Sequence, residues 1–144
     1  MPGSELRGWV AREGPERPAV REEPASPDVP AAHAGDVRAL IAAVRAVHVA
    51  QQVRQYIIEI IAATRTAPAL RLGASPRAAL HLLRASRAYA ALEDRSFVIP
   101  DDVQELAGPV LAHRLLPTAE AVVSREQPEQ VLAKIIERMP LPGR

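Results

Sequence analysis

The stretch LRLGASPRAALHLLRASRAYA, residues 70–90, decides the fold of this 144-residue chain. Gly73, Ser75 and Pro76 stand just ahead of a run rich in alanine and leucine, and Arg77 follows directly. Serine is a preferred N-cap, and proline suits the first helical position because its missing N–H would have no partner there. We therefore predict a helix that begins at Pro76 and carries Arg77 in its first turn.

The position of Arg77 raises a question of function. The first N–H groups of a helix have no intrahelical partner, and the helix dipole adds partial positive charge at that end. An arginine opposes this dipole in water, but with a bound anion the N–H groups and the guanidinium act together. Gly73 would let a ligand or another chain approach closely. Residues 73–77 are thus a candidate phosphate site, and an ordinary surface arginine after a common Ser-Pro start is the alternative.

Apolar residues at helical spacing predict four further helices. Two precede the opening stretch, one with Asp36 as N-cap and one over residues 50–65. Their apolar faces are Val37, Leu40, Ile41 and Val44 in the first, and Val53, Tyr56, Ile57, Ile60, Ile61 and Thr64 in the second. The helix from Pro76 is expected to bury Ala78, Leu82, Ala85, Tyr89 and Leu92.

Two more helices follow, with short extended pieces between elements. One begins near Pro100, and Gly108-Pro109 predicts a kink in it or a division into two short helices. The last covers residues 128–138. Residues 97–99 and the segment LLPTAEAVV are expected to contain short extended structure. Since aromatic residues make up only 3% of the chain, the core must be aliphatic. The predicted fold class is all-α, a compact bundle of about five helices.

Residues 1–35 differ in composition from the rest. They hold six of the fourteen prolines, four of the seven glycines and ten charged residues. A segment with so few apolar side chains cannot offset the entropy lost on ordering, about 1–2 kcal/mol per residue. We predict a disordered, flexible tail or linker over residues 1–35 and a helical domain over residues 36–142.

Composition also excludes several classes of function. The chain has no cysteine, no apolar run of the roughly 18 residues that span a bilayer, and no apolar signal core at its start. We expect a cytoplasmic protein that binds neither membrane nor nucleic acid, because residues 36–144 hold fourteen basic and eleven acidic residues, net +3. His33, His48, His81 and His113 are scattered, so no metal site and no catalytic residue is predicted.

The segment LRLGASPRAALHLLRASRAYAALEDRSFVIPDDVQELAGPVLAHRL resembles the C-terminal lid subdomain of MoxR-type AAA+ ATPases. The resemblance rests on GASPRA, the entry FVIPDDV to the next helix and VLAHRL, in that order. VHVAQQVRQYIIEIIAATR upstream and ERMPLP at the end extend it to about residues 36–142. One departure is Ile99, where the family commonly has a hydroxyl residue as N-cap; its loss costs about 0.5–2 kcal/mol, which Asp101 and Asp102 partly recover.

The resemblance implies a site and a cofactor. Arg77 matches the sensor-2 arginine, which reaches the terminal phosphates of ATP held by the larger α/β subdomain. Gly73 would permit the close approach, Ser75 and Pro76 would fix where the helix starts, and Arg71 would contact the nucleotide or a neighbouring subunit. The chain contains no G-x-x-x-x-G-K-[ST] loop, so the phosphate cradle and magnesium would come from the α/β subdomain. This polypeptide alone is expected not to hydrolyse ATP.

Several alternatives remain open from the sequence. The family implies a ring with neighbouring subunits, a chaperone-like role and partners with von Willebrand A-type domains. The chain is interpreted as a fragment of such an ATPase. The alternative is a free-standing helical interaction module with no nucleotide role, and a DNA-binding domain is the weakest hypothesis.

The other charged residues also have two interpretations. Arg84 and His81 either extend a basic wall of the nucleotide cleft or form a solvated face. Arg87 and Arg95 are expected on the surface. His113 and Arg114 are expected to cap helix carbonyls.

Overall fold

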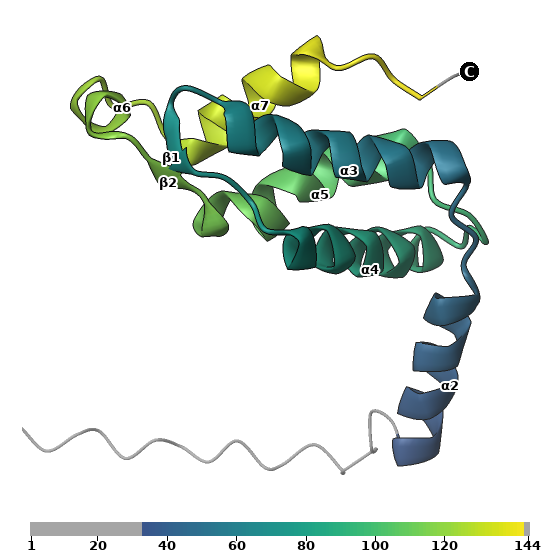
Figure 1. The fold of residues 1–144 in the computed structure, drawn as a ribbon. Coiled ribbons are helices and arrows are strands. Elements are labelled where there is room, and N and C mark those ends of the chain that lie inside the picture. The colour runs from purple at the N-terminus through teal and green to yellow at the C-terminus, as the bar shows by residue number, and fades with distance from the viewer. Residues whose placement is uncertain (1–32, 143–144) are drawn as a thin grey trace, which may run out of the picture. The chain divides into compact units, whose positions relative to one another are not determined.

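The computed structural model describes residues 33–142, so nearly all of the predicted tail lies outside the described residues. In chain order the elements are α2 (Ala34–Ala46), α3 (Gln51–Thr66), β1 (Leu70–Leu72), α4 (Pro76–Leu92), α5 (Pro100–Leu111), the 3-10 helix η1 (Ala112–Arg114), β2 (Leu116–Pro117), α6 (Ala119–Val123) and α7 (Pro128–Arg138). The all-α class is confirmed: the two strands form one short antiparallel pair beside the helices (Figure 1).

Helices α3, α4, α5 and α7 enclose the core. Both α4 and α7 pack against α3 and α5, so the latter two lie between them (Figure 1). The predicted face of α3 is confirmed, since its buried residues are Val53, Tyr56, Ile57, Ile60, Ile61 and Thr64. The interior is built mainly from aliphatic side chains, with Tyr56 as the one fully buried aromatic residue of the described part.

The buried row of α4 differs from the predicted one. Its buried residues are Ala78, Leu82, Ser86 and Ala90, spaced four apart. Leu92 was expected inside but is 82% exposed, and Tyr89 is only half-buried. Ridges of residues four apart pack into the grooves of a neighbouring helix, and small side chains let the two backbones approach. The prediction of Ala78 and Leu82 is confirmed. Beyond Leu82 the buried row continues with Ser86 and Ala90 in place of the expected Ala85, Tyr89 and Leu92.

Helix α2 begins three residues earlier than an N-cap at Asp36 predicts. Asp36 is its third residue and lies in its first turn, so the expectation that it forms the N-cap was wrong. The helix contacts α4 but contributes no buried residue. Its predicted apolar face therefore exists as a stripe along the helix but does not belong to the core.

The sequence predicted either a kink or a division at Gly108-Pro109, and the division was wrong, since α5 continues through these residues to Leu111. Pro109 has no N–H to donate to the Glu105 carbonyl, so α5 reaches Leu111 with one of its helical hydrogen bonds missing. The short extended structure is confirmed: Leu116–Pro117 pairs with β1, and Phe97 forms an isolated bridge with His48. Within residues 33–142, no helix combines the length and apolar character that a membrane crossing requires.

Candidate functional site

The N-terminal end of α4 is open. Arg77 is the second residue of the helix, is exposed, and makes no hydrogen bond or ion pair within the described part of the chain. Ser75 occupies the N-cap position as predicted, yet its hydroxyl accepts no hydrogen bond from the helix. The first turn contains no acidic residue either. This end therefore keeps its partial positive charge, with a guanidinium beside it.

Gly73 makes a close approach to helix α3. A Cβ at this position would lie 2.5 Å from the Thr64 carbonyl oxygen and 2.6 Å from Arg65 Cα. Its φ is not positive, so the requirement for glycine is steric and not conformational. The sequence suggested that this glycine makes room for a ligand; in the structure the room on its Cβ side is filled by the backbone of α3.

Thr64 fixes the turn that precedes α4. Its side chain is fully buried, and its Oγ1 accepts a hydrogen bond from the Ala74 N–H at 2.9 Å. The same hydroxyl donates to the Ile61 carbonyl at 2.7 Å. Together with the contact of Gly73, this bond anchors the turn and thereby the start of α4. The sequence identified Thr64 only as part of an apolar stripe; a buried threonine at the end of such a stripe is the signal that was available.

Three arginines surround a shallow pocket beside this turn. Arg65 at the end of α3, Arg71 in β1 and Arg114 in η1 line it together with residues 72–76, and its volume is about 400 Å³. Arg77 does not line this pocket. Of the predicted residues, the structure thus brings Arg71, Gly73 and Ser75 together and leaves Arg77 to one side.

The pairing of β1 with β2 explains why Arg114 belongs to the pocket. Leu70 lies opposite Pro117 and Leu72 opposite Leu116, which brings η1 next to the turn before α4. The expectation that His113 and Arg114 cap helix carbonyls was wrong: within residues 33–142 neither side chain donates a hydrogen bond. Sequence reasoning missed Arg65 and Arg114 because only the strand pairing places them together.

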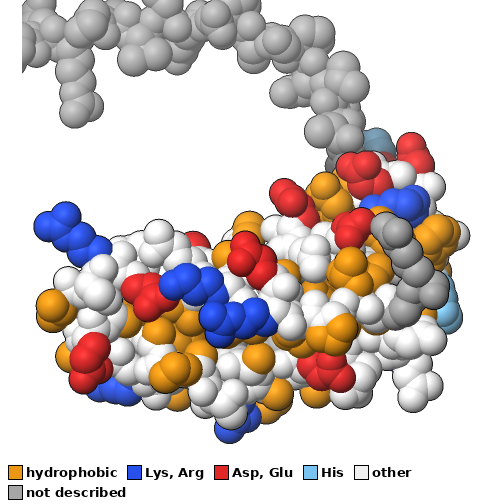
Figure 2. Space-filling view, turned by 90° about the horizontal axis from the view of Figure 1, so that it is seen from above, with side chains coloured by type: hydrophobic (Ala, Val, Ile, Leu, Met, Phe, Trp, Pro, Cys, Tyr) orange, Lys and Arg blue, Asp and Glu red, His pale blue; other side chains and the backbone are white. Residues whose placement is uncertain are grey.

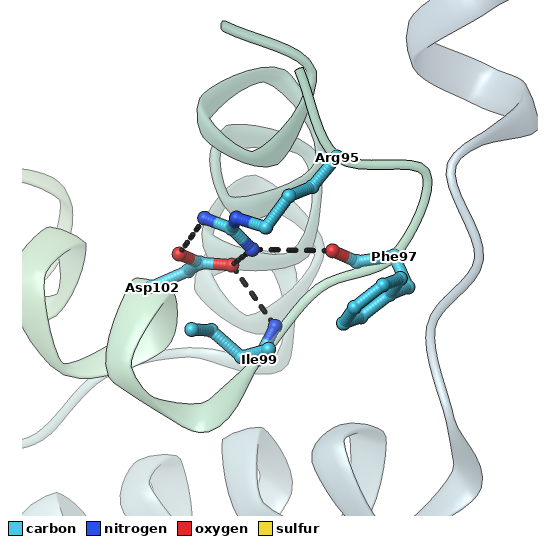
Figure 3. Close-up of polar contacts among 4 residues, drawn as sticks. All are labelled: Arg95, Phe97, Ile99 and Asp102. Carbon is cyan, nitrogen blue, oxygen red and sulfur yellow. Dashed lines mark hydrogen bonds and ion pairs between the residues drawn. The ribbon is translucent and has the colours of Figure 1, made fainter. Parts of the chain in front are cut away.

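Arg95 forms the other notable arginine contact, just beyond the end of α4 (Figure 3). Its guanidinium holds the buried Asp102 carboxylate with two hydrogen bonds of 2.8 and 2.6 Å and also donates to the Phe97 carbonyl. A further donor to this carboxylate is the Ile99 N–H, at 2.9 Å. Hydrogen bonding to Asp102 raises the pKa of Arg95. Arg95 was expected to be a plain surface residue, which was wrong.

This contact also explains the departure at Ile99. Isoleucine has no oxygen to accept from the first turn of α5, so half of the usual cap is missing. Asp102, three residues later, supplies the reciprocal half by accepting from the Ile99 N–H. Besides the expected favourable interaction with the helix dipole, Asp102 therefore offsets the missing cap by a hydrogen bond from the Ile99 N–H and a bidentate ion pair with Arg95.

The remaining charged groups form no catalytic constellation. Within the described range of 33–142, no three His, Asp or Glu side chains are grouped so that they could hold a metal ion. His81 is half-buried and Arg84 exposed on α4. On the face drawn in Figure 2, basic, acidic and apolar side chains are interspersed, without a continuous basic surface. The positive charge at the start of α4 and the arginines of the neighbouring pocket could contact an anion.

Comparison with known proteins gives a consistent result. The family model described as AAA lid domain matches residues 62–135. YeaC of Bacillus subtilis (strain 168), described as uncharacterized, is 40% identical over 90 residues, covering 62% of this chain and 28% of that protein. Chaperone MoxR1 of Mycobacterium tuberculosis is 36% identical over 96 residues, covering 60% and 26%. This chain therefore spans about a quarter of the length of the curated relatives it matches.

A solved structure agrees with these sequence relatives. It comes from Cytophaga hutchinsonii and is described provisionally as an ATPase. The two structures superpose with a TM-score of 0.68 at 29% sequence identity, over 75% of this chain and 34% of the other. Similarity in fold and similarity in sequence each extend over more than half of this chain.

Proposed function

The chain belongs to the AAA lid domain family, with a lid of the MoxR type, and on that premise we propose that it closes over a nucleotide held by an AAA+ α/β subdomain. In this proposal Arg77 is the sensor-2 residue and reaches the terminal phosphates of ATP. The observation that carries the proposal is the open end of α4, where an exposed arginine, without a partner among residues 33–142, stands beside an uncapped first turn.

The physical chemistry of the site supports this role. Phosphoryl transfer is catalysed mainly by positioning and by charges that stabilise the transferring group. A guanidinium and a helix N-terminus offer such charges in a fixed direction. Thr64 and Gly73 hold the turn that sets this direction. Arg71 lies on the neighbouring pocket and would meet the nucleotide or the next subunit of a ring.

The chain's own residues supply only part of the chemistry. ATP would bring its magnesium with ligands from the α/β subdomain, because the described residues offer no carboxylate or histidine cluster for the ion. What Arg77 would do is bind the terminal phosphate, balance its charge and transmit the nucleotide state to α4. We propose a chaperone-like role, as the name of the mycobacterial relative suggests. The ring assembly is proposed from the resemblance to AAA+ ATPases.

A chimaera tests the proposal. Residues 34–142 replace the matching lid segment of the mycobacterial MoxR1 chaperone, and ATP turnover is measured with and without Arg77→Ala. We expect turnover to fall by about two orders of magnitude, as for loss of one preorganised charge at a phosphoryl group. Arg38→Ala, a change to an exposed arginine on α2, is the matched control and should leave turnover unchanged. Equal turnover with and without the Arg77→Ala change would remove the assigned role.

A second candidate is a helical interaction module with no nucleotide role. The specific observation in its favour is the exposed apolar face of α2. The two candidates differ in a titration of the isolated chain with inorganic tripolyphosphate followed by NMR. Weak, salt-sensitive shifts around residues 73–77 favour the lid function, whereas no shift at millimolar tripolyphosphate favours the module.

A further inference from the structure

A groove between α2 and α4 lies apart from the site at the start of α4. Its volume is about 780 Å³, and its apolar lining comes from α2 alone. The apolar residues are Val37, Leu40, Ile41 and Val44, and its other lining residues are Arg45, Arg84 and Arg87. None of the lining residues in the described range is acidic.

The apolar part of this groove is exposed to an unusual degree. Leu40 is 63% exposed, and Val37 and Ile41 are each 47% exposed. These side chains recur at helical spacing, so they form one continuous stripe. An isolated helix of 13 residues is marginal in water, and α2 buries no residue in the core that would stabilise it. An apolar stripe of this kind on an otherwise weakly held helix marks an interaction surface.

The charges at the groove indicate what the partner carries. Three arginines line the groove, and no carboxylate from residues 33–142 lines it with them, so the groove favours an anionic neighbour. The Nε atom of Arg87 is buried and has no hydrogen-bond partner within residues 33–142. A buried donor left unsatisfied costs about 1–3 kcal/mol, and an acceptor from outside removes that cost only if binding turns the Arg87 side chain toward the groove surface. Carboxylates, which accept from guanidinium in a bidentate manner, meet both requirements.

We propose that the groove between α2 and α4 binds an amphipathic helix of another polypeptide whose apolar face is flanked by Asp or Glu. The apolar side of the partner would cover the stripe on α2, in the way that amphipathic helices bind in apolar grooves. Its flanking carboxylates would pair with Arg84 and Arg87 on α4 and with Arg45 on α2. The charge pattern sets the specificity, since a helix with basic flanks would bring like charges together.

The test uses the full chain and two synthetic helical peptides. Both peptides carry leucine at positions i, i+3, i+4 and i+7, and their flanking residues are glutamate in one and lysine in the other. NMR of the isotope-labelled chain reports which residues each peptide contacts. We expect the acidic peptide to shift resonances of α2 and α4, with affinity that falls as salt rises, and the basic peptide to produce no shift at the same concentration.

Substitutions in the chain sharpen the result. Arg84→Glu should weaken the acidic peptide about tenfold and allow the basic peptide to bind, because it reverses a charge at the groove. Leu40→Ser should weaken the acidic peptide without unfolding the chain, since this side chain is mostly exposed. The matched controls are Arg38→Glu on α2 and Leu92→Ser on α4, both exposed residues outside the groove. Neither control should alter binding.

Other outcomes overturn the proposal. Equal binding of both peptides means that the groove recognises only apolar surface. No binding of the acidic peptide at millimolar concentration, or shifts away from α2 and α4, excludes such a partner. Dimerisation of the free chain in sedimentation, abolished by Leu40→Ser, assigns the groove to a second copy. Binding to vesicles that contain phosphatidylserine, lost in the same variant, assigns it to a membrane surface.

Discussion

An arginine lies close to each end of α4, and the two differ in exposure and in hydrogen-bond partners. Arg77 in the first turn is exposed, with no ion pair in the part of the chain that the structure describes. Arg95, three residues beyond the end of the helix, holds a buried carboxylate with two hydrogen bonds (Figure 3). Both belong to a segment that the sequence interprets as one helix with its flanks. The difference teaches that the partner of an arginine, and not its position on the helix, decides whether it supports the fold.

The two ends are also held by different means. At the N-terminal end, the turn before α4 is fixed by buried contacts of Gly73 and Thr64 with α3, and no side chain caps the helix. At the C-terminal end, Arg95 and Asp102 join α4 to α5 across an otherwise irregular connection. Because the contacts that fix the start of α4 are made with α3, the N–H groups of its first turn and Arg77 remain exposed to solvent. That is the arrangement a site for an external anion requires.

Asp102→Ala should produce the largest loss of stability. The substitution removes a buried carboxylate that accepts from Arg95 and from the Ile99 N–H. We expect the free energy of unfolding to fall by about 2–4 kcal/mol, in the range for breaking a buried, hydrogen-bonded charge pair. Urea unfolding followed by circular dichroism measures this loss. Asp101→Ala is the matched control, since this neighbouring residue is exposed and its loss should change stability by less than about 0.5 kcal/mol.

Gly73→Ala should produce the next largest loss. The added Cβ would lie 2.5–2.6 Å from backbone atoms of Thr64 and Arg65, which cannot rotate away. We expect a loss of about 1–3 kcal/mol, typical of overpacking, measured in the same unfolding experiment. Gly108→Ala is the control, because nothing lies within 4 Å of the place its added methyl group would take and alanine suits a helix interior better. Equal effects at both positions would contradict the steric account of Gly73.

The sequence predicted the helices well and the contacts between them poorly. Periodicity located the buried face of α3, and Ser-Pro located the start of α4, because both signals are local. Arg114 lines the pocket beside the turn before α4 only because β1 pairs with β2. Arg95 contacts Asp102 only because α4 and α5 pack together. In the buried row of α4, Ala78 and Leu82 were predicted, whereas Ser86 and Ala90 were missed because packing selected them over Tyr89 and Leu92. Tertiary contacts of this kind leave no periodic signal.

Asp94→Gly should stabilise the chain. Asp94 follows the C-terminal end of α4 and has a φ of 54°, in the left-handed region. Glycine adopts this conformation without the steric cost of a Cβ, and it is the usual residue just past a helix end. We expect a gain of about 0.5–1 kcal/mol in the free energy of unfolding. A loss would mean that the Asp94 side chain contributes a contact that outweighs the strain of its backbone.

Arg77→Ala should have the smallest effect on stability and the opposite sign from Arg95→Ala. An exposed guanidinium in the first turn opposes the helix dipole, so its removal should leave stability unchanged or raise it by a few tenths of a kcal/mol. Arg95→Ala removes the partner of a buried carboxylate and should destabilise the chain.

Thermal unfolding measures the stability of both variants, and the tripolyphosphate titration measures whether each still binds an anion at the start of α4. Arg77→Ala should abolish the shifts around residues 73–77 while Arg95→Ala, below its own melting temperature, retains them. If Arg77→Ala destabilises the fold as much as Arg95→Ala, then Arg77 belongs to the architecture, and the open end of α4 is not a site for an external phosphate.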